Sequence, residues 1–247
     1  MASLQVHPDR TDPAGPADPA GRETVRASLL GQIPSWYSPW LHLIVPGLVG
    51  LAVVIAALTQ VQAPRLTELL AVPLVWVISN IFEWHIHRDV LHHRFAPFGE
   101  LYDRHTPQHH RVFITEDMAI RSWREFRLVL IPAVGVIGIV LLDGGFTVLV
   151  ALVGGRNVAA LYLATAVSYT LSYEWLHLCY HLPEQSWLGR RRLIQWLRRH
   201  HAIHHAPELM QRWNFNVTVP LWDWIRGTIH RDPETDARPL KHDMPVS

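Results

Sequence analysis

The sequence predicts an all-α integral membrane protein, in which a four-helix transmembrane bundle carries a histidine-rich helical cap on its cytoplasmic side. Three observations support this fold class. Apolar tracts of spanning length recur along the chain, 13 of its 17 histidines lie between His85 and His205 in short groups, and these groups alternate with the apolar tracts. Charged residues make up only 17% of the chain, against about 25% in ordinary soluble domains.

Charge and cysteine content exclude several classes of function. The net charge of +1 provides no broad basic field, so we expect no nucleic acid partner. Cys179 is the single cysteine, which excludes a disulfide framework and a cysteine-based metal site.

The chain divides into three parts. Residues 1–35 are rich in Pro, Ala, Gly and Asp and contain no apolar core of signal-peptide length, which predicts a disordered, uncleaved tail. Residues 36–230 form the membrane-embedded domain, and residues 231–247 form a C-terminal tail.

The apolar tracts predict four spans. Leu41–Leu58, with a flanking residue at each end, reaches the length of about 20 residues that a span needs, and Leu66–Trp84 is a second candidate. The long tract Leu128–Trp175 holds two more, which turn either at Asp143–Gly145 or at Gly154–Asn157. Either turn returns the chain to the side it left.

This even number of spans places all the histidine groups on one side of the membrane. The two short loops on the other side contain only Arg65 and Arg156, which leaves 20 of the 22 basic residues on the histidine side. By the positive-inside rule, that side and both termini are cytoplasmic. Within it, Gln185–His200 mixes Trp187 and Trp196 with five arginines, which predicts an interfacial amphipathic helix.

The histidines form four groups with helical spacing. The groups are "HIHRDVLHH" (His85–His93), "HTPQHH" (His105–His110), "HLCYH" (His177–His181) and "HHAIHH" (His200–His205). Residues three and four apart share a helix face, so each group can present two or three rings in one direction. His87 and His92 are five apart and need a local change in helix winding.

Neutral imidazole is the commonest side-chain ligand for Zn, Cu and Fe, and about ten rings suit two metal ions better than one. His85, His93 and His200 are weaker candidates for metal ligands. They either support the ligands from outside or are simply adjacent to them. The isolated His7, His42, His230 and His242 are interpreted as ordinary hydrogen-bonded residues.

Two acidic residues stand at the inner ends of predicted spans, just before histidine groups. Glu83 precedes the first group and Glu174 the third. An acid at a membrane boundary is a candidate functional residue, and Glu174 lies on the face of His177, where it could accept a ring N–H. A solvated interfacial carboxylate is the alternative for both.

The order of the boxes resembles the fatty acid hydroxylase branch of the fatty acid hydroxylase / sterol desaturase superfamily of integral-membrane diiron enzymes. The boxes are H-x4-H (His87–His92), H-x3-HH, H-x3-H and H-x2-HH (His201–His205). The run "NFNVTVPLWDWIRGT" (Asn214–Thr228) is similar to the sequence that follows the last box in that family. The resemblance covers roughly Trp76 to Thr228.

The resemblance implies a centre of two iron ions under a transmembrane bundle, with zinc as a substitute in a purified form. Carried over by position, the metal-binding and catalytic residues are His87, His92, His105, His109, His110, His177, His181, His201, His204 and His205. The second box has three intervening residues where some members have two, which leaves the role of His105 open. Asn216 replaces the family's usual Gly and is expected to change the local backbone only.

The resemblance also implies partners and a reaction. A membrane lipid, O2 and a separate electron donor, ferredoxin- or cytochrome b5-like, are expected, with hydroxylation of a lipid chain as the outcome. A sterol or carotenoid oxidase and a lipid desaturase are alternatives in the same superfamily. A histidine-rich metal-binding or transporting membrane protein is an alternative from another class, although transport predicts ligands inside the spans. The Trp222 and Trp224 side chains are expected to anchor at the membrane interface or to pack in a turn.

Overall fold

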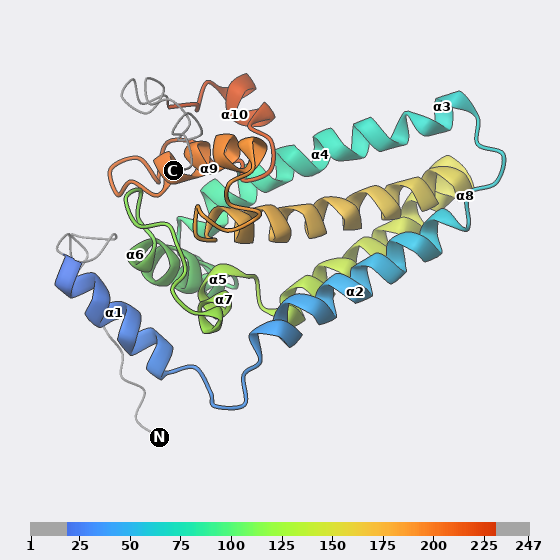
Figure 1. The fold of residues 1–247 in the computed structure, drawn as a ribbon. Helices are drawn as coiled ribbons and strands as arrows, with labels where there is room; N and C mark the ends of the chain where they lie inside the picture. Colours follow the sequence, from blue (N-terminus) through green and yellow to red (C-terminus); the bar gives the residue numbers. More distant parts are fainter. Residues whose placement is uncertain (1–18, 231–247) are drawn as a thin grey trace, which may run out of the picture.

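The computed structural model describes residues 19–230, and this part of the chain is helical, without a β-strand. An elongated bundle extends from a broader cap (Figure 1). The helical segments, in chain order, are α1 (Pro19–Gly31), α2 (Pro39–Leu58), α3 (Leu66–Leu69), α4 (Ala71–His85), η1 (Ile86–Leu91), α5 (Gly99–Arg104), η2 (His105–His109), α6 (His110–Val112), η3 (Trp123–Glu125), α7 (Phe126–Val129), α8 (Ala133–Tyr180), α9 (Arg192–His204) and α10 (Leu221–Arg226).

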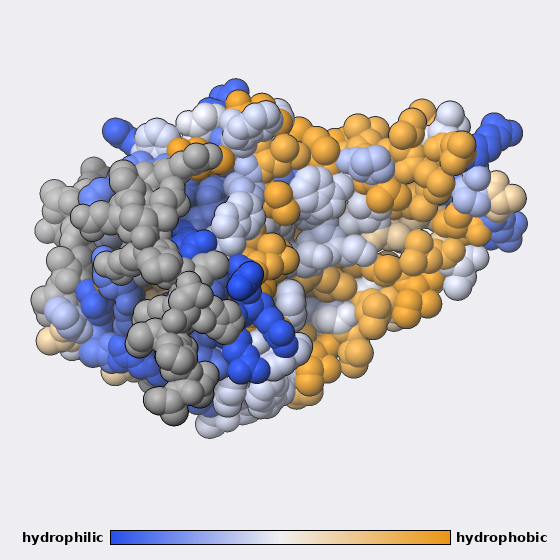
Figure 2. Space-filling view, turned by 45° about the horizontal axis from the view of Figure 1, so that its top comes forward, coloured by the Kyte–Doolittle hydropathy of each residue, from blue (hydrophilic) through white to orange (hydrophobic). Residues whose placement is uncertain are grey.

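Three helices in the described part are long and apolar enough to cross a membrane: α2, the continuous stretch Leu66–Leu91, and α8. Helix α2 starts sharply because Ser38 accepts a hydrogen bond from the Leu41 N–H and Pro39 occupies the first turn, where no intrahelical donor is needed. Figure 2 shows the apolar residues covering the bundle, with hydrophilic residues over the cap and at the opposite tip. This distribution indicates a membrane protein.

Helix α8 is two antiparallel legs joined at Gly155. Gly155 has a φ of 78°, a conformation that favours glycine, and it interrupts the helical backbone. The Tyr162 hydroxyl lies 3.3 Å from the Asp143 carboxylate. In a straight helix these residues would be about 28 Å apart, at about 1.5 Å per residue. The predicted turn at Gly154–Asn157 is therefore confirmed, and the alternative at Asp143–Gly145 is wrong because those residues remain helical.

The two loops at the far tip of the bundle are joined to each other. The side chain of Asn157 makes two 3.0 Å hydrogen bonds with the backbone of Gln62, and Arg156 donates to the side chain of Gln60. Both loops therefore lie at the end away from the cap, and each pair of legs leaves the cap and returns to it (Figure 1). The expected four-helix bundle corresponds to three candidate spans, the last of which contains two legs.

The cap has its own apolar core, built around Phe113, Phe126 and Tyr180. Helix α1 packs on this core through Val25 and Leu29. The prediction of a disordered tail over residues 1–35 is therefore wrong for Pro19–Gly31, since composition averaged over the segment concealed its apolar face. Residues 1–18 and the predicted tail 231–247 lie outside the described residues.

The interfacial helix predicted at Gln185–His200 begins later and runs further than expected. Helix α9 starts at Arg192 and continues to His204. Residues 185–191 form turns, and at Gly189 a side chain would meet the Pro183 carbonyl oxygen at 2.3 Å. Trp187 and Trp196 are exposed, as an interfacial segment requires.

Candidate metal centre

All ten histidines carried over from the sequence motifs come together in the cap, in two groups of five. In each group the candidate ligand nitrogens all lie within 4.8 Å of one another, and every ring is buried. Centre A consists of His87, His92, His105, His110 and His204, and centre B consists of His109, His177, His181, His201 and His205. The centres are adjacent, because the rings of His110 and His205 stack with centroids 4.2 Å apart. Each group could hold a metal ion.

Two short π-helices set the spacing of the first two boxes. η1 carries His87, and His92 follows its last residue; η2 begins at His105 and is followed by His110. In a π-helix the hydrogen bonds run from residue i to i+5, so rings five apart lie one above the other. This explains why His87 pairs with His92 and His105 with His110. His105 and His109, which are four apart, stack with ring centroids 5.3 Å apart, but they belong to different centres.

The third and fourth boxes lie on α-helices. His177 and His181 are four apart at the end of α8, and both serve centre B as their spacing predicts. His201 on α9 and His205, which follows the helix, also belong to centre B, but His204 belongs to centre A. The last box therefore contributes to both centres, although the spacing predicts a single direction for its three rings.

Backbone carbonyls hold five of these ten rings in one tautomer. A carbonyl oxygen only accepts, so an Nδ1 atom beside it must carry the proton, and the Nε2 atom keeps its lone pair. The Nδ1 contacts are His87 with Phe215 O, His204 with Trp213 O, His109 with Leu128 O, His181 with Met118 O and His205 with Phe113 O, at 2.5–3.0 Å. Metal-ligating histidines are oriented in this way.

His92 reaches the same tautomer through a hydroxyl. The Thr106 hydroxyl donates its proton to Leu91 O at 2.8 Å, so it can only accept from the His92 Nδ1–H, at 3.0 Å. The Nε2 atom of His92 therefore also presents a lone pair.

The Nε2 atoms of His92 and His204 lie 3.0 Å apart, each without a proton in its neutral ring. Two lone pairs at this distance repel unless a cation lies between them. Burial, together with neighbouring histidines, lowers the pKa of both rings well below the usual range, so a shared proton is disfavoured. Two nitrogens bound at right angles to one ion, each at about 2.1 Å, would lie about 3.0 Å apart. The donor set fits a divalent transition metal.

In centre B, ring nitrogens without a hydrogen-bond partner indicate that a metal ion could bind. The Nε2 atoms of His109, His177 and His181 are buried and have no hydrogen-bond partner among the described residues. Buried polar atoms are almost always satisfied, so three converging exceptions indicate a place where a ligand can bind. Desolvation lowers the pKa of His109 and His181 well below the usual range, which keeps both rings neutral and able to bind metal.

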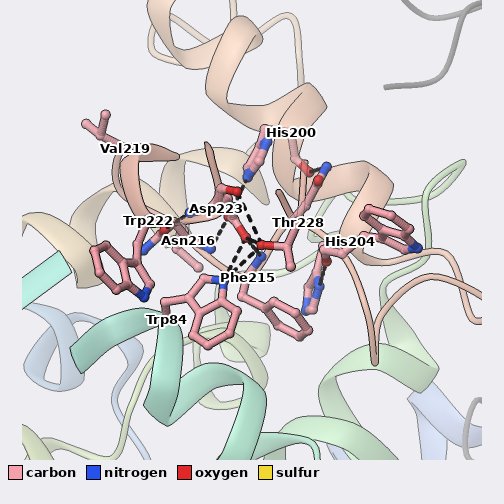
Figure 3. Close-up of polar contacts among 12 residues, drawn as sticks. Trp84, His200, His204, Phe215, Asn216, Val219, Trp222, Asp223 and Thr228 are labelled. Carbon is pink, nitrogen blue, oxygen red and sulfur yellow. Dashed lines mark hydrogen bonds and ion pairs between the residues drawn. The ribbon is translucent and has the colours of Figure 1, made fainter. Parts of the chain in front are cut away.

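A buried carboxylate, Asp223, organises the chain beside centre A (Figure 3). It accepts hydrogen bonds from the backbone N–H groups of Phe215 and Asn216, the indole of Trp84 and the ring of His200, at 2.7–3.1 Å. Burial alone would raise the pKa of Asp223, but hydrogen bonds, first of all from His200, lower it below the usual value. By fixing this backbone, Asp223 fixes the Phe215 carbonyl that orients His87.

The two acidic candidates of the sequence have structural partners. Glu83 is buried and accepts hydrogen bonds from the backbone of Val217 and Thr218, which ties the C-terminal segment to α4. Glu174 is buried and accepts from the Ile131 N–H at 3.1 Å. The carboxylate therefore neither contacts His177 nor lies in solvent, so neither of the two alternatives for Glu174 holds.

The remaining histidines lie outside both centres. His85 pairs with Asp89, His93 with the Arg88 carbonyl, and His200 with Asp223. His42 is buried and hydrogen-bonded to Tyr37 and Ile131, as expected of an isolated histidine. His230 packs on Trp213, but its Nδ1 atom is buried and has no hydrogen-bond partner among the described residues, so a hydrogen-bonded ring is not confirmed there. His7 and His242 lie outside the described residues.

Comparison with known proteins identifies the family. A model of the fatty acid hydroxylase family matches residues 72–228, which is more than half of the chain. The chain belongs to the fatty acid hydroxylase family. The resemblance read from the boxes is therefore confirmed, and an oxidoreductase fits both the family and the histidine clusters. Comparisons with curated proteins and with solved structures find no match.

The sequence analysis missed the residues that orient the candidate ligands. Thr106 lies inside the second box, and Asp223 lies in the quoted C-terminal run, but neither has a metal-ligand spacing. Asn216, expected to affect only the backbone, donates from its side chain to Asn80 O and accepts from the Asp223 N–H, both at 3.0 Å. Of the two tryptophans expected to anchor or to pack, Trp224 is 69% exposed. The backbone N–H of Trp222 donates to the side chain of Asn80.

Proposed function

We propose that the protein is a membrane-bound diiron oxygenase that hydroxylates a lipid, a fatty acyl chain in the simplest case. The observation that carries the proposal is the pair of unprotonated Nε2 atoms of His92 and His204, 3.0 Å apart within one of two adjacent five-histidine groups. An all-nitrogen donor set suits iron, and zinc would occupy the same groups in a purified form.

When bound, two iron ions would supply the activation of O2 that oxidation of an unactivated C–H bond requires. One oxygen atom enters the lipid as a hydroxyl group and the other leaves as water, with two protons and two electrons consumed. The electrons come from a separate ferredoxin- or cytochrome b5-like protein in this proposal.

The residues of the chain hold and shield the centre. Carbonyls from Phe113 and Phe215 and the hydroxyl of Thr106 aim neutral rings inward, and all ten rings are buried. A dry site suppresses side reactions and strengthens electrostatic interactions within it. The apolar surface of the bundle adjoins the cap (Figure 2), which would bring the site next to lipid chains.

We further propose that α2, Leu66–Leu91 and the two legs of α8 cross the membrane four times, with the cap and both termini in the cytoplasm. The joined loops at the tip and the 20 basic residues on the histidine side support this topology. Thiol labelling tests it, with one cysteine introduced at a time and the unaltered protein, which contains only the buried Cys179, as the blank. A cysteine at Gln62 should react from outside intact cells, and one at Gln211 only after permeabilisation; the opposite pattern would reverse the orientation.

Lipid mass spectrometry of expressing cells tests the reaction, with His204→Ala as the inactive control. A lipid that gains one oxygen only with the wild-type protein is expected. A loss of two hydrogens would replace hydroxylation by desaturation, and no change in the presence of bound metal and a donor would point to a metal-binding protein.

A further inference from the structure

The guanidinium of Arg26, on helix α1, is buried against the cap. Arg26 is only 4% exposed, and its guanidinium lies 2.5 Å from the Glu125 carboxylate and 3.5 Å from that of Asp117. It also donates to the Val112 carbonyl at 3.2 Å and lies over the ring of Phe113 at 5.2 Å. This helix precedes the region that matches the family, residues 72–228.

Arg26 thereby joins two segments that orient rings of centre B. Phe113 accepts the Nδ1–H of His205 at 2.7 Å, and its own ring contacts His181 at 4.6 Å. Met118, beside Asp117, accepts the Nδ1–H of His181 at 2.8 Å. Two of the five rings of centre B therefore depend on backbone that the guanidinium holds in place.

Centre A takes its support from elsewhere. Its oriented rings bond Phe215, Trp213 and Thr106, none of which touches Arg26. One ring of centre A, His110, lies on the braced segment, just before Val112, and the other four do not.

We propose that Arg26 is a positioning residue for centre B, so that α1 is part of the metal-holding cap. The inference rests on the proposed function, since it requires that centre B hold a metal ion. The guanidinium fork reaches a carboxylate and a carbonyl at once, which the single ammonium of lysine does not reproduce. Its removal leaves Glu125, 1% exposed, as a buried unpaired carboxylate.

The test counts iron per chain in purified protein from iron-replete cells, by elemental mass spectrometry. Wild type should contain two irons and Arg26→Gln about one. Arg121→Gln is the matched control, because Arg121 bridges Glu23 and Asp117 between the same segments but is 49% exposed, and it should keep two. The double variant Arg26→Gln/Glu125→Gln removes the unpaired charge and should regain part of the second iron.

Double variants assign the lost iron to a centre. Arg26→Gln combined with His181→Ala should keep one iron, because both changes affect centre B. Combined with His92→Ala it should keep none. The reverse pattern, or two irons in Arg26→Gln, overturns the inference. An equal loss from both centres also overturns it, because Arg26 would then stabilise the cap as a whole.

A second variant keeps the test open if Arg26→Gln does not accumulate in the membrane. Arg26→Lys keeps the charge and loses the fork, and a chelator should then remove one of the two irons about 10-fold faster than in wild type. Equal rates overturn the inference. Wild type without two irons would overturn the proposed function itself, which distinguishes that failure from a failure of Arg26 alone.

Discussion

Centres A and B contain the same five-imidazole donor set, but different parts of the chain support them. Centre A is supported by the C-terminal segment and by Thr106. The Trp213 and Phe215 carbonyls accept hydrogen bonds from ring N–H groups, Asp223 fixes the Phe215 backbone, and the Thr106 hydroxyl accepts from His92. Centre B is held by Phe113, Met118 and Leu128, on the segment that α1 braces. Two similar ligand sets are thus fixed by two independent supports.

Histidines that are neighbours in the sequence nevertheless belong to different centres. His109 and His110 are neighbours in sequence and serve different centres, as do His204 and His205. Such pairs link the two centres, but loss of the contact that orients one ring should affect first the centre to which that ring belongs. The predictions below use this distinction.

Single ligand substitutions should have the largest effect and should separate the centres. His204→Ala removes a ring of centre A, and His205→Ala removes one of centre B. Each variant should retain about one iron and lose more than about 100-fold in activity, the upper end of what outer partners contribute. Iron analysis beside product analysis checks this. Full activity in either variant contradicts its assignment as a ligand.

Acidification should empty both centres over the same pH range. Burial lowers the folded-state pKa of His105, His110, His181 and His205 well below the unfolded value of about 6.5, so below that pH the unfolded chain binds more protons. Stability without metal should therefore fall as pH drops, by about 1.4 kcal/mol per pH unit for each such proton, and metal should dissociate. Iron content and unfolding midpoints between pH 7.5 and pH 5 measure this; unchanged values at pH 5 contradict it.

Asp223→Asn should weaken centre A while centre B keeps its ion. The amide retains the size of the carboxylate but replaces an acceptor oxygen, so at least one buried donor among the Trp84 indole and the Phe215 and Asn216 N–H groups loses its partner. The expected cost is about 1–3 kcal/mol of folding stability and about a 10-fold loss of iron affinity at one centre. Chelator titration measures two affinities, and equal losses at both contradict the separate supports.

Thr106→Val should give the smallest effect. Valine keeps the shape of threonine but removes the hydroxyl that accepts from the His92 Nδ1–H and donates to Leu91 O. We expect up to about a 10-fold weaker iron affinity at centre A, with no change at centre B. Thr115→Val is a matched control, because this hydroxyl bonds Ala202 O and no histidine. Equal effects of the two substitutions would contradict a role for Thr106 in orienting His92.

The sequence predicted the ligands more completely than their grouping. The histidine boxes, through the family resemblance that they carry, predicted all ten rings that converge. The apolar tracts predicted the candidate spans and, as one of two alternatives, the turn near Gly155. Division into two centres depends on the π-helical winding of η1 and η2, a local change that a 3.6-residue period does not contain. Asp223 and Arg26 act through contacts with distant segments, which spacing along one helix does not reveal.

Anomalous diffraction at the iron edge tests the central claim most directly, on crystals of wild-type protein from iron-replete cells. We predict two peaks, one among the Nε2 atoms of His92, His204 and their partners in centre A, and one among those of His109, His177 and His181 in centre B. A single peak, or none in a protein that keeps this fold, would contradict the account.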